Sequence, residues 1–142
     1  MRSRGIVQCI IVVVCVFAVV GGASGSIVRV KWDSPNNGPG NDWEHAYLTV
    51  TAGLNAAVSG DEVWVAGNSA HPYVERITLT LGMALYGGFA GMETERDQRN
   101  WQTNVTILDG NREGTVVTSP NGAAASTRID GFTVRNGMGS SG

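Results

Sequence analysis

The sequence predicts an all-β protein whose short strands repeat along the chain as the coils of a parallel β-solenoid. Three observations lead to this fold class: the composition, a series of short strand-like runs and a regular repeat of glycine-containing motifs. Of the 142 residues, 20 are glycine and only 15% are charged, which is unlike a helix bundle or a coiled coil. The composition therefore favours short strands joined by frequent turns.

The candidate strands are β-branched or aromatic runs bounded by Gly, Asn or Asp. They are residues 63–65, 77–79, 84–86, 105–108, 115–117 and 132–134.

Four tetrads define the repeat, each with an apolar residue first and glycine third. They are Val65-Ala66-Gly67-Asn68, Tyr86-Gly87-Gly88-Phe89, Leu108-Asp109-Gly110-Asn111 and Ile129-Asp130-Gly131-Phe132. Their successive separations of 21, 22 and 21 match one coil of a solenoid. We expect about four coils over residues 61–137, with Gly67, Gly88, Gly110 and Gly131 at corners, because glycine accepts a positive φ or a close backbone approach.

A second register competes with this one. Val63, Leu85, Ile107 and Ile129 are evenly spaced along the chain, and aligning them shifts the last coil by one residue and turns its strand inside out. We expect the glycine register, because corners are harder to move than strand residues.

Residues 1–25 predict a secretory signal peptide. Arg2 and Arg4 precede an apolar run over residues 6–20, and small residues follow it. The run is shorter than the roughly 20 apolar residues of a membrane span, which favours cleavage between Ala23 and Gly25 over an uncleaved anchor. We therefore expect a secreted, cell-surface or periplasmic protein.

Cysteine usage and charge narrow the function classes. Cys9 and Cys15 are the two cysteines, so a processed chain holds no disulfide. The formal net charge of −2 gives no support for a nucleic-acid or anionic-membrane partner.

Residues 26–42 are rich in turn-forming types and predict an exposed loop or linker. Several side chains there offer oxygens suited to calcium: Asp33, Asn36, Asn37, Asn41 and Asp42. The ordered ligand series of a known calcium loop is missing, so plain loop chemistry is favoured, with calcium as the alternative.

Residues 43–60 predict a helix. Tyr47, Val50, Leu54 and Val58 recur at three- and four-residue steps, which is one helix face, and Gly60 ends the pattern. Because the end of a solenoid exposes apolar core, we expect this helix to be an N-terminal cap.

The order of motifs along the chain resembles that of a known group. The motifs are Trp43-Glu44-His45-Ala46, Gly60-Asp61-Glu62-Val63-Trp64-Val65-Ala66-Gly67, Leu85-Tyr86-Gly87-Gly88-Phe89-Ala90-Gly91-Met92-Glu93-Thr94, Arg99-Asn100-Trp101, Thr106-Ile107-Leu108-Asp109-Gly110 and Ile129-Asp130-Gly131-Phe132-Thr133-Val134. Over residues 31–137 the chain resembles bacterial right-handed parallel β-helix proteins of the pectate-lyase-like fold, including surface proteins of the polymorphic outer-membrane type common in planctomycetes.

The resemblance implies a right-handed parallel β-helix but leaves the activity open, since this fold hosts several functions. We expect a structural, adhesion or display module, with a polysaccharide lyase or glycoside hydrolase as the alternative. Such proteins usually continue for many more coils, so residues 138–142 read as a Gly/Ser tail within the N-terminal part of a longer protein. An uncapped last coil predicts self-association, and extracellular polysaccharide or a cell-surface component is the other expected partner.

The glycine register places Asp109 and Asp130 in one column, about 4.8 Å apart. Relatives that cleave acidic polysaccharide hold calcium on such stacked acids and use an arginine or lysine as base, for which Arg128 is a candidate and Arg112 and Arg135 lie nearby. The competing interpretation is favoured: each Asp precedes Gly and makes a turn.

Three further features carry candidate chemistry. Trp101 ends a charged loop over residues 93–101 and is a candidate for stacking on a sugar, although a solvated loop whose Trp folds back on the stack is favoured. His45 and His71 have no second ligand at zinc spacing. Asn104-Val105-Thr106 matches the glycosylation acceptor pattern.

Overall fold

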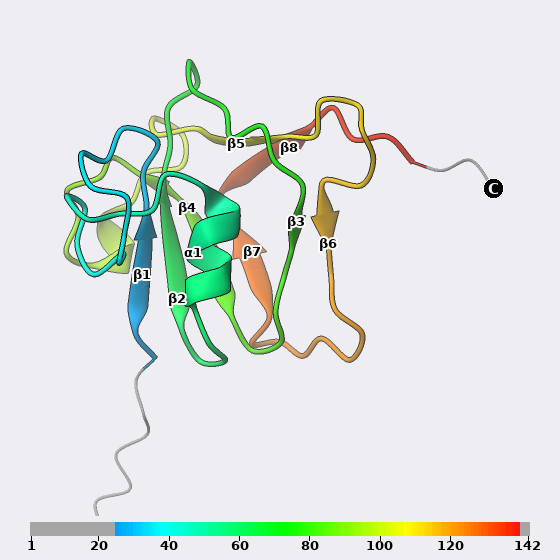
Figure 1. Ribbon diagram of the computed structural model, residues 1–142, viewed down its shortest axis with the longest axis horizontal. Helices are drawn as coiled ribbons and strands as arrows, with labels where there is room; N and C mark the ends of the chain where they lie inside the picture. Colours follow the sequence, from blue (N-terminus) through cyan, green and yellow to red (C-terminus); the bar gives the residue numbers. More distant parts are fainter. Residues whose placement is uncertain (1–24, 140–142) are drawn as a thin grey trace, which may run out of the picture.

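The computed structural model describes residues 25–139 as a mostly β fold with parallel sheets and one short α-helix (Figure 1). The predicted signal peptide up to residue 24 and the last residues of the predicted tail lie outside this range. Within it, no helix is long and apolar enough to span a bilayer.

The strands of this range form three sheets, and their paired strands all run parallel. The first sheet has the order β1 (Ile27–Val30), β2 (Glu62–Ala66), β4 (Ala84–Phe89) and β7 (Arg128–Asp130). The second pairs β3 (Ile77–Thr78) with β6 (Val117–Thr118), and the third pairs β5 (Thr106–Asp109) with β8 (Phe132–Arg135). The helices are α1 (Val50–Ala56) and the short 3₁₀-helix η1 (Arg96–Gln98).

β1 corrects the prediction that residues 26–42 are all loop. Its residues alternate between partly exposed and buried positions, and Val28 and Val30 pair with Val63 and Val65 of β2. The alternation is the period of a half-buried strand, but it covers too few residues to stand out beside the long loop that follows.

The register of the first sheet follows the even spacing of Val63, Leu85 and Ile129, so the predicted glycine register is wrong. Val63 pairs with Leu85, one spacing later, and Leu85 pairs with Ile129, two spacings later. A bulge follows Trp64 and shifts the next pairing to Ala66 with Phe89. The burial of the inward column sets the register, because a one-residue slip would carry apolar side chains to the outer face.

The prediction of evenly repeated coils is correct only between β2 and β4. Ile107, which the spacing places beside Leu85 and Ile129, lies in the third sheet and pairs with Thr133. The second sheet pairs Ile77 with Val117, almost two predicted coils further along the chain. Connections of very different length separate the strands, so one sequence period cannot describe all three sheets.

The four tetrad glycines occupy two kinds of position. Gly88 and Gly131 have φ values of 94° and 77°, where a side chain would strain the backbone. Gly67 and Gly110 have no such φ, but a methyl group on Gly67 would overlap Thr106 and Asn104, and one on Gly110 would lie 2.6 Å from Val116.

The core lies between the first sheet and a layer made by α1, β3 and β6, which follow one another across the sheet in Figure 1. Side chains from both layers are buried there. They include Val30, Val50, Leu54, Val63, Ile77, Leu85 and Leu108.

α1 is much shorter than the predicted helix over residues 43–60. Thr49 is its N-cap and accepts a hydrogen bond from Ala52 N, and the Glu75 carboxylate accepts from the N–H groups of Val50 and Thr51. These bonds satisfy N–H groups that a helix start leaves free. Tyr47 stays outside the helix because it forms a parallel bridge with Val30.

The free edge of β1 is covered by the segment that follows it. Arg29 N donates to Gly40 O at 2.8 Å, Tyr47 N donates to Arg29 O at 2.9 Å, and Lys31 N donates to Tyr47 O at 2.8 Å. This end of the first sheet is therefore closed by backbone hydrogen bonds within the chain.

Candidate functional site

Asp109 and Asp130 do not stack in one column, so that prediction is wrong. Asp109 lies on β5 of the third sheet and pairs with Arg135, whereas Asp130 lies on β7 of the first sheet and pairs with Tyr86. The wrong register explains the error, because the predicted column combined residues of two sheets.

The Asp109 carboxylate is buried and is held by a donor from its own turn and by donors from β8 and the residue after it. Asn111 N donates to Oδ1 at 3.0 Å, Arg135 Nε donates to Oδ2 at 2.7 Å, and Asn136 Nδ2 donates to both oxygens. The Asn111 backbone N–H, followed by Arg135, lowers the pKa of Asp109 from its ordinary 3.8 to about 2. A carboxylate so engaged is a poor proton acceptor, and its geometry is that of a tie between β5 and β8.

Asp130 is engaged by a different arginine. Arg99 Nη2 lies 2.9 Å from Asp130 Oδ1, Arg99 Nη1 donates to Gly87 O at 3.0 Å, and the guanidinium lies 5.0 Å from the centre of the Tyr86 ring. Arg128, the candidate base, is an exposed residue two positions before Asp130 on the same strand. The candidate acids and base do not converge on one groove.

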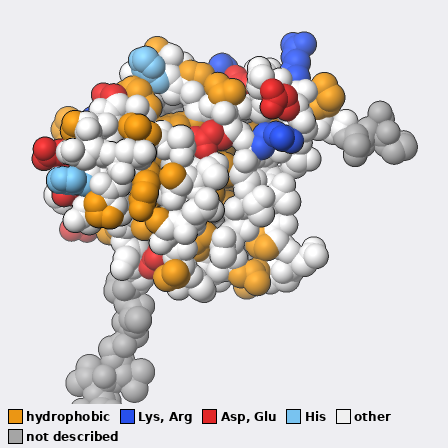
Figure 2. Space-filling view, viewed as in Figure 1, with side chains coloured by type: hydrophobic (Ala, Val, Ile, Leu, Met, Phe, Trp, Pro, Cys, Tyr) orange, Lys and Arg blue, Asp and Glu red, His pale blue; other side chains and the backbone are white. Residues whose placement is uncertain are grey.

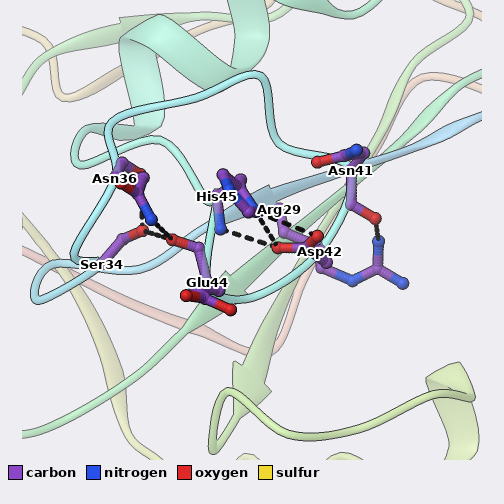
Figure 3. A network of polar contacts seen from close by, with 7 residues as sticks. All are labelled: Arg29, Ser34, Asn36, Asn41, Asp42, Glu44 and His45. Atoms are coloured by element: carbon purple, nitrogen blue, oxygen red, sulfur yellow. Dashed lines mark hydrogen bonds and ion pairs between the residues drawn. The ribbon is translucent and has the colours of Figure 1, made fainter.

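The polar side chains of the first loop bind one another (Figure 3). Asp42 accepts from His45 N at 2.7 Å and lies 2.9 Å from His45 Nδ1, and Ser34 Oγ donates to the carbonyl oxygens of Asn36 and Glu44. The Asn41 carbonyl accepts from Arg29. The candidate calcium oxygens of Asp42 are therefore used in the loop's own turns.

The remaining candidates in that loop have partners too. Asp33 pairs with Lys31 at 3.0 Å, and Asn37 Oδ1 accepts from Leu48 N at 3.2 Å. Across residues 25–139, no group of three or more His, Cys, Asp and Glu side chains is arranged to hold a metal ion.

An aromatic cluster on the outer face of the first sheet was not anticipated from the sequence. Trp64, Tyr86 and Phe89 are buried there, and the Trp64 and Phe89 rings stack with centroids 4.7 Å apart. The segment after β4 returns over this face and places Arg96 over the Tyr86 ring at 5.0 Å. The sequence pattern that could have indicated this cluster is the alternation at Trp64, which faces outward because its neighbours Val63 and Val65 face the core.

A cleft of about 410 Å³ lies beside this cluster, between the start of β2 and the segment around η1. Its lining residues include Ile27, Glu62, Trp64, Glu95, Arg96 and Asp97. Glu62 accepts from Trp64 Nε1 at 2.8 Å and from Arg96 Nη1 at 2.6 Å. The Glu62 carboxylate is therefore engaged by these two partners. The Glu95 side chain accepts from the backbone N–H of Gln98 in a capping box at the start of η1.

Trp101, the candidate for stacking on a sugar, is accessible. Its side chain is 57% exposed, so the expectation that it folds back onto the stack is wrong. The arginines of the same loop fold back instead, because Tyr86 offers them a ring face. The backbone beneath Trp101 is tightly placed, since a methyl group on Gly88 would lie 2.7 Å from Trp101 Cα.

The histidines and the glycosylation pattern have structural partners. His71 stacks on Trp32 with ring centroids 5.6 Å apart and an angle of 9°. Asn104 Nδ2 donates to Gly88 O at 3.2 Å, and Thr106 is buried with its hydroxyl accepting from Gly88 N at 2.9 Å. The acceptor pattern thus forms part of the corner at Gly88.

Charge does not single out a ligand class. On the face shown in Figure 2, charged side chains lie mostly near the upper and left margins and include both signs.

The geometry thus defines a mostly β protein of parallel sheets whose buried or half-buried carboxylates are tied within the fold. In comparisons with protein-family models, curated proteins and solved structures, the chain has no match. The resemblance to β-helix surface proteins therefore stays a prediction.

Proposed function

We propose that the chain is an exported right-handed parallel β-helix module that adheres to extracellular polysaccharide at a cell surface. The solenoid part of the proposal is supported by the three parallel sheets, whose strands come from successive passes of the chain. Parallel strands joined by crossovers are almost always right-handed. The signal-peptide pattern of residues 1–25 supports export.

The observation that carries the adhesion role is the way the turn at Trp101 is built. Asn100 N donates to Gly88 O at 2.7 Å, and Asn100 Oδ1 accepts from the N–H groups of Gln102 and Thr103 at 3.0 and 3.2 Å. These bonds tie the turn to the corner of the first sheet. An exposed indole on a backbone already held in place loses little conformational entropy on binding.

The side chains around the indole suit a sugar. Trp presents a large apolar ring with one polar N–H, and the face of a pyranose offers C–H groups to such a ring. Gln102 and Thr103 are exposed neighbours with donors and acceptors for sugar hydroxyls. A Trp in this setting is also the residue type most often found at the energetic centre of an interface.

The adhesion role is tested by comparing the binding of the chain and of its Trp101→Ala variant to a panel of soluble polysaccharides that includes polygalacturonate. We expect the chain to bind at least one polysaccharide, and the variant to bind it about tenfold or more weakly. Leu81→Ala is the matched control, because Leu81 is also an exposed apolar residue but lies in the turn before β4. Unchanged binding in Trp101→Ala, or no binding by the chain to any member, would contradict the proposal.

The same preparations test the alternative of a polysaccharide lyase. The separation of Asp109 from Asp130 and their engagement by different arginines do not favour that alternative. Eliminative cleavage of polygalacturonate with added calcium, lost in Asp130→Asn, would establish it and displace the adhesion role.

A further inference from the structure

Within residues 25–139, the last strand of each sheet carries an inward apolar side chain that is only partly covered. In every case its partner in the preceding strand is buried, whereas the residue of the last strand is not. The pairs are Leu85 with Ile129, Leu108 with Val134 and Ile77 with Val117.

These side chains surround one opening of about 560 Å³ at the end formed by β6, β7 and β8. Its lining includes Val116, Val117, Ile129, Val134 and Met138, and also the polar residues Thr115, Arg135 and Asn136. Val134 is 49% exposed and Met138 is 54% exposed. Apolar surface thus faces solvent at this end, and covering it would be favourable.

A head-to-tail contact that adds the open edge of β7 to the edge of β1 is blocked, because the β1 edge already bonds to Gly40 and Tyr47 of its own chain. A copy that presents the same end, β6, β7 and β8, offers an identical apolar opening in return, and two identical surfaces meet about a twofold axis.

The open edge of β7 is compatible with that axis. Arg128 N donates to Met83 O on the β4 side, so the N–H and C=O of Ile129, the next residue, point to the open side. A twofold axis midway between the two Ile129 residues pairs the two β7 strands antiparallel, and these residues exchange both backbone hydrogen bonds.

The charged residues on either side of Ile129 support the same alignment. Residues equidistant from Ile129 face each other in this pairing, so Arg128 of one copy lies opposite Asp130 of the other. Both side chains point to the outer face, because Ile129 between them points to the core beside Leu85. Opposite charges in directly opposed positions stabilise an antiparallel pair, and this alignment supplies two such pairs.

We propose that two copies of the chain associate through the β6–β7–β8 end, with their β7 strands antiparallel about Ile129 and Arg128 of each opposite Asp130 of the other. The opening of each copy then covers that of its partner. This interaction surface is separate from Trp101 and does not rest on the proposed adhesion role.

Sedimentation of the purified chain over a wide concentration range tests the proposal. We expect a monomer–dimer equilibrium, with Arg128→Glu and Asp130→Lys each weakening association about tenfold or more. Either variant alone places like charges opposite each other. In the heterodimer of the two variants, the introduced carboxylate of one lies opposite the introduced ammonium group of the other, so association returns on equimolar mixing.

Two controls keep the experiment decisive. Arg112→Glu makes the same charge change at an exposed residue outside the opening and leaves the dimer intact. Circular dichroism and thermal unfolding show that each variant is folded, which matters for Asp130→Lys because it also removes the partner of Arg99. A monomer at all concentrations, a dimer that Arg128→Glu does not weaken, or open-ended growth beyond dimers would overturn the proposal.

Discussion

The first and last strands of the sheets both direct apolar residues toward the core, but in the described part of the chain only the first strand, β1, is covered by another part of the chain. At the β1 end, Val30 is fully buried beneath α1, and Tyr47 and Gly40 bond to the strand edge. At the β6–β7–β8 end, Val134 of β8 pairs with the buried Leu108 and is itself half exposed. Of Val30 and Val134, the one with a layer on both sides is buried, and at the β1 end the chain supplies the outer layer itself.

The largest expected effect compares two residues of one inward column. Leu85→Ala removes a fully buried side chain between two layers and is expected to lower the free energy of unfolding by about 3 kcal/mol. Ile129→Ala removes a side chain covered on one side only and is expected to cost about 1 kcal/mol. Urea unfolding at concentrations below those of association measures both. Equal losses would show that the end of the stack is covered in the monomer.

A smaller effect concerns the contact between α1 and β1. A methyl group at Gly53 would overlap Val30 Cγ2, so Gly53→Ala is expected to destabilise the fold by about 2 kcal/mol although alanine is the better helix former. Gly139→Ala at the other end is the control, since nothing lies within 4 Å of the added methyl, and it is expected to change stability by less than about 0.5 kcal/mol. Stabilisation by Gly53→Ala would mean that α1 is not held tightly against β1.

The smallest effect is a pH dependence of the tie between β5 and β8. Because the pKa of Asp109 is about 2 in the fold and 3.8 ordinarily, its ionised form stabilises the folded state above about pH 4, and this contribution is lost as the pH falls toward 2. Asp109→Asn removes that part of the acid dependence. Urea midpoints of both proteins between pH 5 and pH 2 should converge on acidification, and parallel curves would contradict the assignment.

Most of the strands were predictable, but their partners were not. The runs around Val63, Leu85 and Ile107 were identified because β-branched and aromatic residues between turn residues mark a strand locally. Their equal spacing suggested one column, yet Ile107 belongs to another sheet. A sequence period describes spacing along the chain, whereas pairing depends on where each connection returns the chain in space.

The candidate site shows the same division. Trp101 was identified by its residue type and its loop, and only the fold decided that its indole is exposed and that Arg96 and Arg99 cover Tyr86 instead. Asp109 and Asp130 were identified as acids before glycine, but their arginine partners lie 26 and 31 residues away. No local pattern reports contacts at such separations.

By itself the sequence determined the strand-rich composition, most of the strand positions and the glycines at the turns, because these follow from interactions between neighbouring residues. The tertiary structure alone decided the register and the sheet to which each strand belongs. Within residues 25–139 it also decided that the β1 edge is covered by its own chain and that the β7 edge is not paired with another strand. Those features depend on burial shared between residues tens of positions apart. Only the folded chain brings such residues into contact.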